Sequence, residues 1–202
     1  MDDLVWATRE SRATAFSVEA DLLAELVQGQ HPKILYIGCS DSRIMPSRIL
    51  GARPGEVFTL RNIANIVPPA TAHDQTVAAV LTYAVQHLHV AHIVVCGHSL
   101  CGGIQALGAA HARLELALKH WLVYARPATD RVPLTLEGEN RLEALIEANV
   151  LVQVEHLRSY TFIAQAEAAR DLQIHAWVYD FRCGQVRVYD PASGAFVTEP
   201  PF

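Results

Sequence analysis

The sequence lacks the features that mark several large classes of protein. Its 202 residues carry a net charge of −5, and Lys and Arg form no clustered stripe, which argues against a protein that binds nucleic-acid backbones. No apolar run reaches the roughly 18 residues that a membrane-spanning helix needs. Repeats, low-complexity tracts and linker-like shifts in composition are also missing. We therefore expect a single domain over residues 1–202 that acts on a small molecule, with no nucleic acid and no membrane as partner.

The first thirty residues lack the basic start and the unbroken apolar stretch of a secretory signal. This pattern favours a cytoplasmic protein, and thiols stay reduced in the cytoplasm. The sequence contains four cysteines. In a reducing compartment they indicate metal binding or catalysis before they indicate disulfides.

Half of the residues are hydrophobic, which is enough for a sizeable core. Short apolar runs predict strands, and apolar residues at helical spacing predict helices. The expected strands are 33–38, 56–60, 91–96, 174–181 and 185–190, and the expected helices are 2–28 in two pieces, 74–89, 101–126 and 138–170. This alternation predicts an α/β fold in which helices cover both faces of a central, largely parallel sheet. The last two strands are close enough to form an antiparallel hairpin at its edge.

Two of the predicted strands end in residues that can bind a metal. Cys39 follows the first strand, and His98 and Cys101 follow a later one. Parallel sheets carry their sites at the carboxyl ends of their strands, so these three side chains are expected to converge if the two strands are neighbours. Thiolate sulfur and imidazole nitrogen are ligands that zinc prefers, and three protein ligands leave a fourth position for water. The sequence therefore predicts a catalytic zinc site on these three residues.

The turn after the first strand also carries Asp41 and Arg43. A guanidinium can hold a carboxylate with two hydrogen bonds and keep it ionised. Asp41 would then accept the proton of a zinc-bound water, or it would bind the metal itself and close the site. An ordinary surface ion pair is the alternative interpretation of the same two residues.

Two other chemistries fit these residues less well. A nucleophilic Cys39 activated by His98 would leave Cys101 without a role. A phosphatase-like loop would also need an arginine where Met45 stands. The glycines at 102 and 103 are not followed by Lys-Ser/Thr, which excludes a P-loop.

With these motifs identified, the chain resembles a β-class carbonic anhydrase over nearly its whole length, from about Gln30. The sequences Cys39-Ser-Asp-Ser-Arg43 and Gly97-His-Ser-Leu-Cys-Gly-Gly103 match the two zinc motifs of that family in order and separation. The resemblance implies that Cys39, His98 and Cys101 hold Zn²⁺. It implies reversible hydration of carbon dioxide to bicarbonate by a zinc-bound hydroxide, which the catalytic pair Asp41 and Arg43 orients.

The resemblance also implies a set of substrate-binding residues. Gln30 would hydrogen-bond the substrate or bicarbonate, and Phe58, Ile63 and Tyr83 would line an apolar pocket that the partner subunit completes in part. Gly102 is grouped with them. Simple core packing remains an equally good interpretation for each of the three pocket residues. The family pattern further implies a homodimer or a dimer of dimers, in which residues 1–28 form a helical arm around the partner.

Some questions stay open at this point. Tyr36 stands where some bacterial members have a Trp in a regulatory bicarbonate pocket, although Arg61 and Tyr179 match that pocket. The zinc motifs do not separate hydration of carbon dioxide from hydrolysis of a related heterocumulene such as carbon disulfide. They also do not exclude a non-catalytic homologue that only binds zinc or bicarbonate.

Overall fold

The computed structural model describes residues 20–108 and 114–198, and the chain divides into two units, Met1–His31 and Pro32–Phe202. The described part of the first unit holds helix α2 (Ala20–Leu26), which ends two residues before the end of the helix predicted over 2–28. The part of the predicted helix over 2–28 that precedes Ala20 lies outside the described residues. The prediction of one domain with an arm over residues 1–28 stays a prediction.

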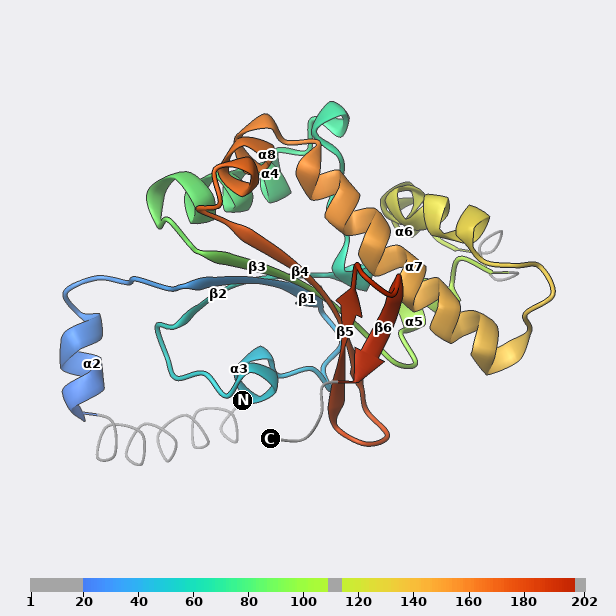
Figure 1. Ribbon diagram of the computed structural model, residues 1–202, viewed down its shortest axis with the longest axis horizontal. Helices are drawn as coiled ribbons and strands as arrows, with labels where there is room; N and C mark the ends of the chain where they lie inside the picture. Colours follow the sequence, from blue (N-terminus) through green and yellow to red (C-terminus); the bar gives the residue numbers. More distant parts are fainter. Residues whose placement is uncertain (1–19, 109–113, 199–202) are drawn as a thin grey trace. The chain divides into compact units, whose positions relative to one another are not determined.

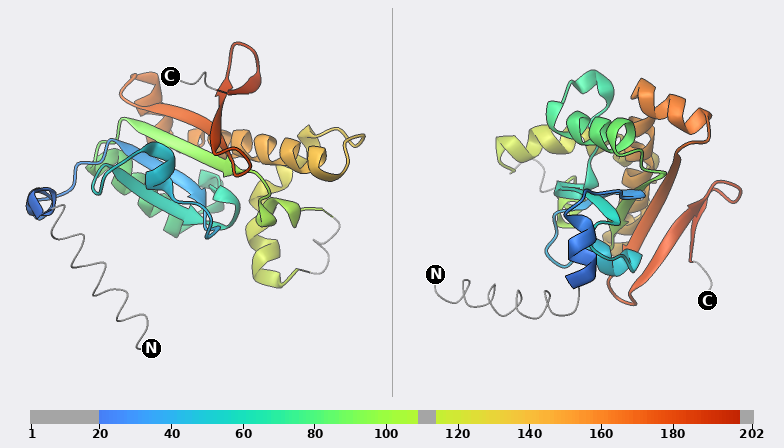
Figure 2. Two further views of the ribbon diagram at one scale, coloured as in Figure 1. Left: turned by 90° about the horizontal axis from the view of Figure 1, so that it is seen from below. Right: turned by 90° about the vertical axis from the view of Figure 1, so that its left-hand side faces the viewer.

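The second unit is built on one six-stranded sheet with the strand order β2-β1-β3-β4-β5-β6 (Figure 1). Four neighbouring strands are parallel: β2 (Val57–Asn62), β1 (Ile34–Cys39), β3 (His92–His98) and β4 (Gln173–Asp180). Two antiparallel strands, β5 (Gln185–Asp190) and β6 (Ala195–Thr198), extend the sheet at one edge. They turn away from the parallel part (Figure 2). The predicted α/β fold is confirmed, and β6 is an addition to it.

The helices of the second unit lie in the connections between the strands. Their bounds are α3 (Pro46–Leu50), η1 (Ile63–Asn65), η2 (Ala70–Ala72), α4 (Gln75–Thr82) followed by a π-helical turn η3 (Tyr83–His87), α5 (Gly102–Gln105), α6 (Leu116–Leu122), η5 (Val123–Arg131), α7 (Gly138–Arg158) and α8 (Thr161–Ala168). The predicted helix over 101–126 is broken into shorter pieces. The predicted helix over 138–170 divides into α7 and α8.

The two faces of the sheet differ in how much core they carry. The face under α4, α7 and α8 belongs to the large hydrophobic core (Figure 1). On the opposite face a small buried cluster contains Tyr36, Val94 and Cys96. Helix α7 packs closely on β3 at Gly97. A Cβ added at this glycine would stand 2.7 Å from a methyl group of Val150. Only glycine allows this close approach, and the next residue along β3 is the predicted ligand His98.

Within the described residues, no helix is long and apolar enough to cross a membrane.

Candidate metal centre

Neighbouring parallel strands bring the three predicted ligands together. Cys39 ends β1 and His98 ends β3, and these two strands pair directly. Cys101 follows three residues later, at the N-cap of α5. All three side chains are buried, and their ligand atoms lie within 4.8 Å of one another. Among the described residues this is the one group of three that could hold a metal ion.

The backbone from His98 to Gly103 has two unusual local features. Leu100 has a φ of 56°, in the left-handed region that few non-glycine residues adopt. At Gly103 an added Cβ would lie 2.9 Å from a methyl group of Ile63 and 3.0 Å from the Cβ of Ala64. The start of α5 therefore packs against η1 with no room for a side chain. Such a strained turn is often found at functional sites.

The donor set fits zinc. His98 is 1% exposed, and its Nδ1 lies 2.9 Å from the carbonyl oxygen of Ser99. That contact leaves Nε2 to act as a ligand. In the described structure Nε2 is buried and has no hydrogen-bond partner. An orphaned buried nitrogen is costly, and a metal ion beside the two cysteines would satisfy it.

The two cysteines influence each other strongly. The Cys101 thiol, supported by His98 and by the backbone N–H groups of Asp41 and Ala64, lowers the pKa of Cys39 to about 4 against the opposing effect of burial. The pKa of Cys101 is raised instead, by the neighbouring Cys39 and by burial. The two thiols share one proton, and the proton is held by Cys101 while Cys39 is ionised. Such a pair gives up its first proton easily, as a metal-binding thiolate must.

Asp41 is held by Arg43 and lies next to the metal ligands. Its Oδ1 accepts hydrogen bonds from the Arg43 backbone N–H at 3.0 Å and from Nε at 2.9 Å, and its Oδ2 accepts one from Nη2 at 2.7 Å. This guanidinium holds the pKa of Asp41 well below its usual range. The Oδ2 atom also lies 3.9 Å from Nε2 of His98. The predicted pair therefore exists, and its carboxylate stands at the edge of the ligand group.

Sequence reasoning missed the residues that fix the backbone around the ligands. Arg61 donates from Nε to the carbonyl of Cys39 at 2.9 Å and from Nη2 to that of Asp41 at 2.7 Å. Two buried amides of α7 hold the segment after β2. Asn149 donates to the carbonyl of Ala64 at 3.1 Å, and Gln153 accepts from the N–H of Val67 at 2.9 Å. The separation of 85 and 86 residues between these partners hides them from any local pattern.

The predicted pocket residues occupy different positions. Phe58 is half-buried on β2, and its ring centroid lies 5.8 Å from that of Tyr83 on η3. Ile63 follows β2, and its methyl group would lie 2.9 Å from a Cβ added at Gly103. Ile63 and Tyr83 are 39% and 46% exposed, so neither is an ordinary core residue in the single chain. Their role in substrate binding stays a prediction.

Two further predicted residues take no direct part in the described site. A Cβ added at Gly102 would meet nothing within 4 Å, so packing does not explain this glycine as it explains Gly103. Gln30 belongs to the first unit of the chain, and its substrate contact stays a prediction. The doubtful regulatory pocket gains no support from Tyr36, which is fully buried. The Arg61 guanidinium binds backbone carbonyls, as described above.

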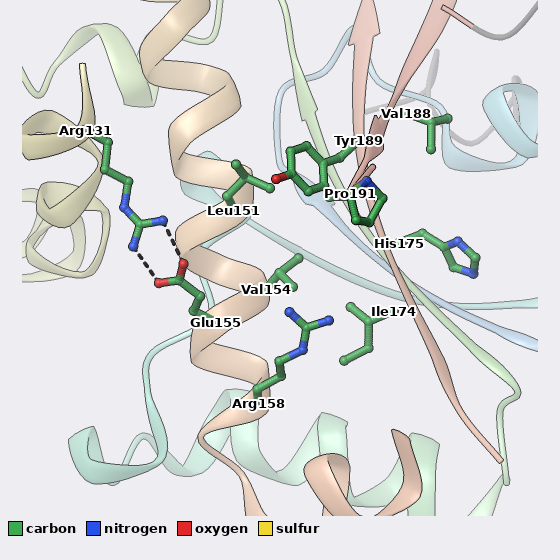
Figure 3. Close-up of a pocket in the computed structure, with 11 residues that line it drawn as sticks. Arg131, Leu151, Val154, Glu155, Arg158, Ile174, His175, Val188, Tyr189 and Pro191 are labelled. Atoms are coloured by element: carbon green, nitrogen blue, oxygen red, sulfur yellow. Dashed lines mark hydrogen bonds and ion pairs between the residues drawn. The ribbon is translucent and has the colours of Figure 1, made fainter. Parts of the chain in front are cut away.

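One hollow of the described surface lies away from the metal ligands. A cavity of about 520 Å³ opens between α7 and the strands β4 and β5, and Figure 3 shows the Arg131–Glu155 ion pair at its rim. A second, smaller hollow of about 260 Å³ has Arg43 and Tyr179 in its lining. None of the three ligand residues lines either hollow.

Comparisons with known proteins agree on one family. The family model described as carbonic anhydrase matches residues 34–186. A carbonic anhydrase of Synechocystis sp. is 37% identical over 204 residues, covering 98% of this chain and 74% of the relative. The solved structure of the β-carbonic anhydrase CcaA superposes with a TM-score of 0.93 at 34% identity, covering 98% of each chain. A tetrameric β-carbonic anhydrase from Sordaria macrospora gives a TM-score of 0.83 at 34% identity, covering 93% of this chain and 97% of its own.

Proposed function

This chain belongs to the β class of the carbonic anhydrase family, and we propose that Cys39, His98 and Cys101 hold its zinc while Asp41 and Arg43 serve the reaction. The protein catalyses the reversible hydration of carbon dioxide to bicarbonate, with zinc as cofactor. The observation that carries the residue assignment is the buried group of three ligand atoms beside a carboxylate that Arg43 holds in place.

Each ligand has a separate task in this proposal. When bound, zinc lowers the pKa of water towards about 7 and so makes a hydroxide nucleophile available near neutral pH. Cys39 and Cys101 provide negative charge, and the lowered pKa of Cys39 favours the ionised pair. The Ser99 carbonyl beside Nδ1 fixes the tautomer of His98 and aims Nε2 at the metal.

Asp41 orients the reacting water. Its two oxygens already accept three hydrogen bonds from Arg43, and Oδ2 keeps a free lone pair on the side of His98. A water molecule at that place would donate a hydrogen bond to Oδ2, which would leave its lone pair free to face carbon dioxide. Because its pKa is held low, Asp41 stays an acceptor throughout the neutral pH range. The same ion pair with Arg43 would hold the carboxylate back from a metal ion on the three ligand atoms.

The substrate pocket is completed by a second copy of the chain. Carbon dioxide is apolar and needs a small dry pocket, but Ile63, Tyr83 and Leu100 are each at least 39% exposed in one chain. We therefore place them at a dimer interface, with residues 1–28 as the arm that reaches the partner. Gln30 and Gly102 then contact the substrate. The tetrameric relative from Sordaria macrospora supports an oligomer built from such dimers.

A cytoplasmic location is also part of the proposal. All four cysteines are free thiols in the structure, which fits a reducing compartment.

The relatives described above favour carbon dioxide hydration over carbon disulfide hydrolysis.

Stopped-flow hydration of carbon dioxide, followed by a pH indicator, tests the assignment. The protein is first analysed for zinc, and the proton released with each bicarbonate is then recorded. A zinc-loaded protein should give a rate far above the uncatalysed one at pH 8.5. A fully loaded protein with no rate above background would refute the proposed function. Sedimentation analysis of the same sample tests the dimer, because a monomeric active enzyme would contradict the shared pocket.

A further inference from the structure

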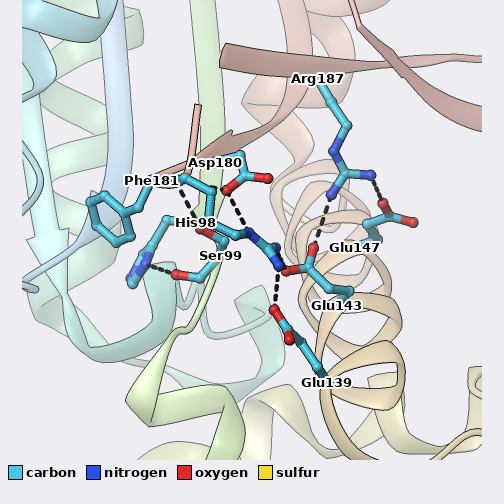
Figure 4. A network of polar contacts seen from close by, with 9 residues as sticks. His98, Ser99, Glu139, Glu143, Glu147, Asp180, Phe181 and Arg187 are labelled. Atoms are coloured by element: carbon cyan, nitrogen blue, oxygen red, sulfur yellow. Dashed lines mark hydrogen bonds and ion pairs between the residues drawn. The ribbon is translucent and has the colours of Figure 1, made fainter. Parts of the chain in front are cut away.

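Phe181 contacts two residues of the site at once. It follows β4 directly, and its ring centroid lies 5.2 Å from that of the His98 imidazole, in an edge-to-face arrangement with an interplanar angle of 64°. The guanidinium carbon of Arg43 stands over the same ring, 4.5 Å from its centroid. Figure 4 shows Phe181 beside His98 and Ser99. The ring thus connects a proposed metal ligand with the partner of Asp41.

Arg43 is held on its edges and on one face. Nε and Nη2 donate to the Asp41 carboxylate, and Nη2 also lies 3.3 Å from the carbonyl oxygen of Leu100. These contacts lie at the edges of the guanidinium and leave its flat faces open. The Phe181 ring covers one of them, at a distance at which a cation is attracted to the negative face of an aromatic ring. Arg43 is otherwise half-exposed, so this contact limits how far it can move.

The backbone around Phe181 is fixed by hydrogen bonds and ion pairs to other parts of the fold. Its backbone N–H donates to the Ser99 hydroxyl at 2.9 Å, and the N–H of Ser99 donates to the carbonyl of Tyr179 at 2.9 Å. The next residue, Arg182, binds Asp180 and forms ion pairs with Glu139 and Glu143 of α7. Figure 4 labels these three carboxylates. The ring therefore stands on a segment that is tied both to β3 and to the long helix.

We propose that Phe181 is a positioning residue, whose ring holds the Arg43 guanidinium in the place where it grips Asp41 and at the same time supports the His98 imidazole. The proposal rests on the proposed function, because it assigns a purpose to the Asp41–Arg43 pair. Without the ring, Arg43 keeps its charge but loses one of its supports. Asp41 is then less firmly held and competes with water and with added anions for the metal.

Graded fluorination of Phe181 separates the ring's electrostatics from its shape. Phenylalanine, 4-fluoro-, 3,5-difluoro- and 3,4,5-trifluorophenylalanine at position 181 have nearly the same size, while the negative charge on the ring face declines along the series. A cation–π contact of ordinary strength corresponds to about a five-fold change in an equilibrium. We expect kcat for carbon dioxide hydration to fall stepwise, to about a fifth in the trifluoro protein. The kcat of Phe181→Leu should fall at least as far. The kcat of Phe181→Trp should be close to that of the wild type, because tryptophan restores an aromatic face.

A second measurement does not depend on turnover. Thiocyanate is titrated into the cobalt-substituted protein and its binding is followed by the visible absorption of cobalt. The apparent Kd should rise along the same series by about the same factor, because a released Asp41 competes with the anion. Metal content and Tm are recorded for every protein. Phe162, whose ring packs on Tyr160 at 5.9 Å in α8, is the matched control, and trifluorophenylalanine at that position should change neither kcat nor the Kd.

Two outcomes would overturn the proposal. A flat fluorination series in an active, zinc-loaded protein would show that the ring face does not hold Arg43, even if Phe181→Leu is impaired. Equal kcat and Kd for Phe181→Leu and the wild type would show that the ring is not needed at all. Either result leaves the proposed function intact, whereas a wild-type protein that is zinc-loaded and inactive would refute that function directly.

Discussion

Cys39 and Cys96 are both buried thiols on neighbouring strands, but their surroundings are opposite in effect. Cys39, with Cys101, His98 and two backbone N–H groups around it, has a pKa lowered to about 4. Burial raises the pKa of Cys96 to about 11, and its neighbours Tyr36 and the backbone of Tyr179 offset this only in part. Burial alone therefore gives an inert thiol. A metal ligand needs neighbours that stabilise the thiolate.

The largest effect is expected from exchanging the two thiols for hydroxyls. Cys39→Ser should lose most of its zinc and lower the hydration rate by more than about 100-fold, because a hard hydroxyl replaces a soft thiolate. Cys96→Ser should keep its zinc and lose about 1–3 kcal/mol of unfolding free energy, since it buries a hydroxyl. Elemental analysis and chemical denaturation measure the two effects. Normal zinc content in Cys39→Ser would contradict the ligand assignment.

The next effect concerns the carboxylate beside the ligands. Asp41→Asn should keep its zinc but lower kcat by about 10²–10⁴-fold, because an amide cannot serve as the charged acceptor for the reacting water. Asp190→Asn is the control, since the Asp190 carboxylate accepts its hydrogen bonds from Ala192 and Ser193 in an exposed turn. Stopped-flow rates on metal-analysed proteins decide the matter. An Asp41→Asn protein with full activity would reduce the pair to an ordinary surface contact.

Gly102 and Gly103 test how tightly the start of α5 packs against η1. Gly103→Ala should cost about 1–3 kcal/mol, because the new methyl group collides with Ile63 and Ala64. Gly102→Ala meets open space in the chain, so the free energy of unfolding should change by less than about 0.5 kcal/mol. If Gly102 contacts substrate, the same variant should raise KM while Tm stays constant. Equal stability losses for the two variants would argue against the packing described here.

The smallest effect is expected from a histidine near the Cys96 cluster. His175 lies 3.2 Å from a ring nitrogen of His92, and burial together with His92 lowers its pKa. His175 therefore binds a proton more readily in the unfolded chain than in the folded one. The free energy of unfolding falls as the pH drops below about 6.5. His175→Gln should flatten this decline in Tm between pH 7 and 5. The exposed His120→Gln should leave it unchanged, and a His175→Gln protein with the wild-type pH profile would contradict the interpretation.

Local patterns predicted much of this structure from the sequence. Apolar runs predicted the five longer strands. The residues at and after two strand ends predicted a group that converges in the structure and could hold a metal ion, because parallel strands present their carboxyl ends together. The strand β6 has only four residues, too few for a clear alternation. The helix predicted over 101–126 is interrupted, and two glycines of low helix propensity stand at its start.

The rest of the site depends on contacts between distant residues. Arg61 reaches the Cys39 turn from the next strand, and Phe181 reaches Arg43 from the far end of the chain. The φ of Leu100 is set by the closure of the turn between two ligands, and leucine itself does not signal it. Phe181 belongs to neither of the two motifs that predicted the site, and a lone aromatic residue after a strand does not signal a contact with Arg43.

The buried amides of α7 have a consequence for how the protein is made. All three proposed metal ligands lie within the first half of the chain, but the segment at Ala64 and Val67 is held by Asn149 and Gln153. A ribosome therefore releases the complete ligand set well before it releases the helix that supports it. During this interval the thiols of Cys39 and Cys101 exist without their final framework, exposed to oxidants and to competing metals. We therefore expect correct metal loading to be a late event of biosynthesis, and slow translation between residues 101 and 149 to lengthen the vulnerable period.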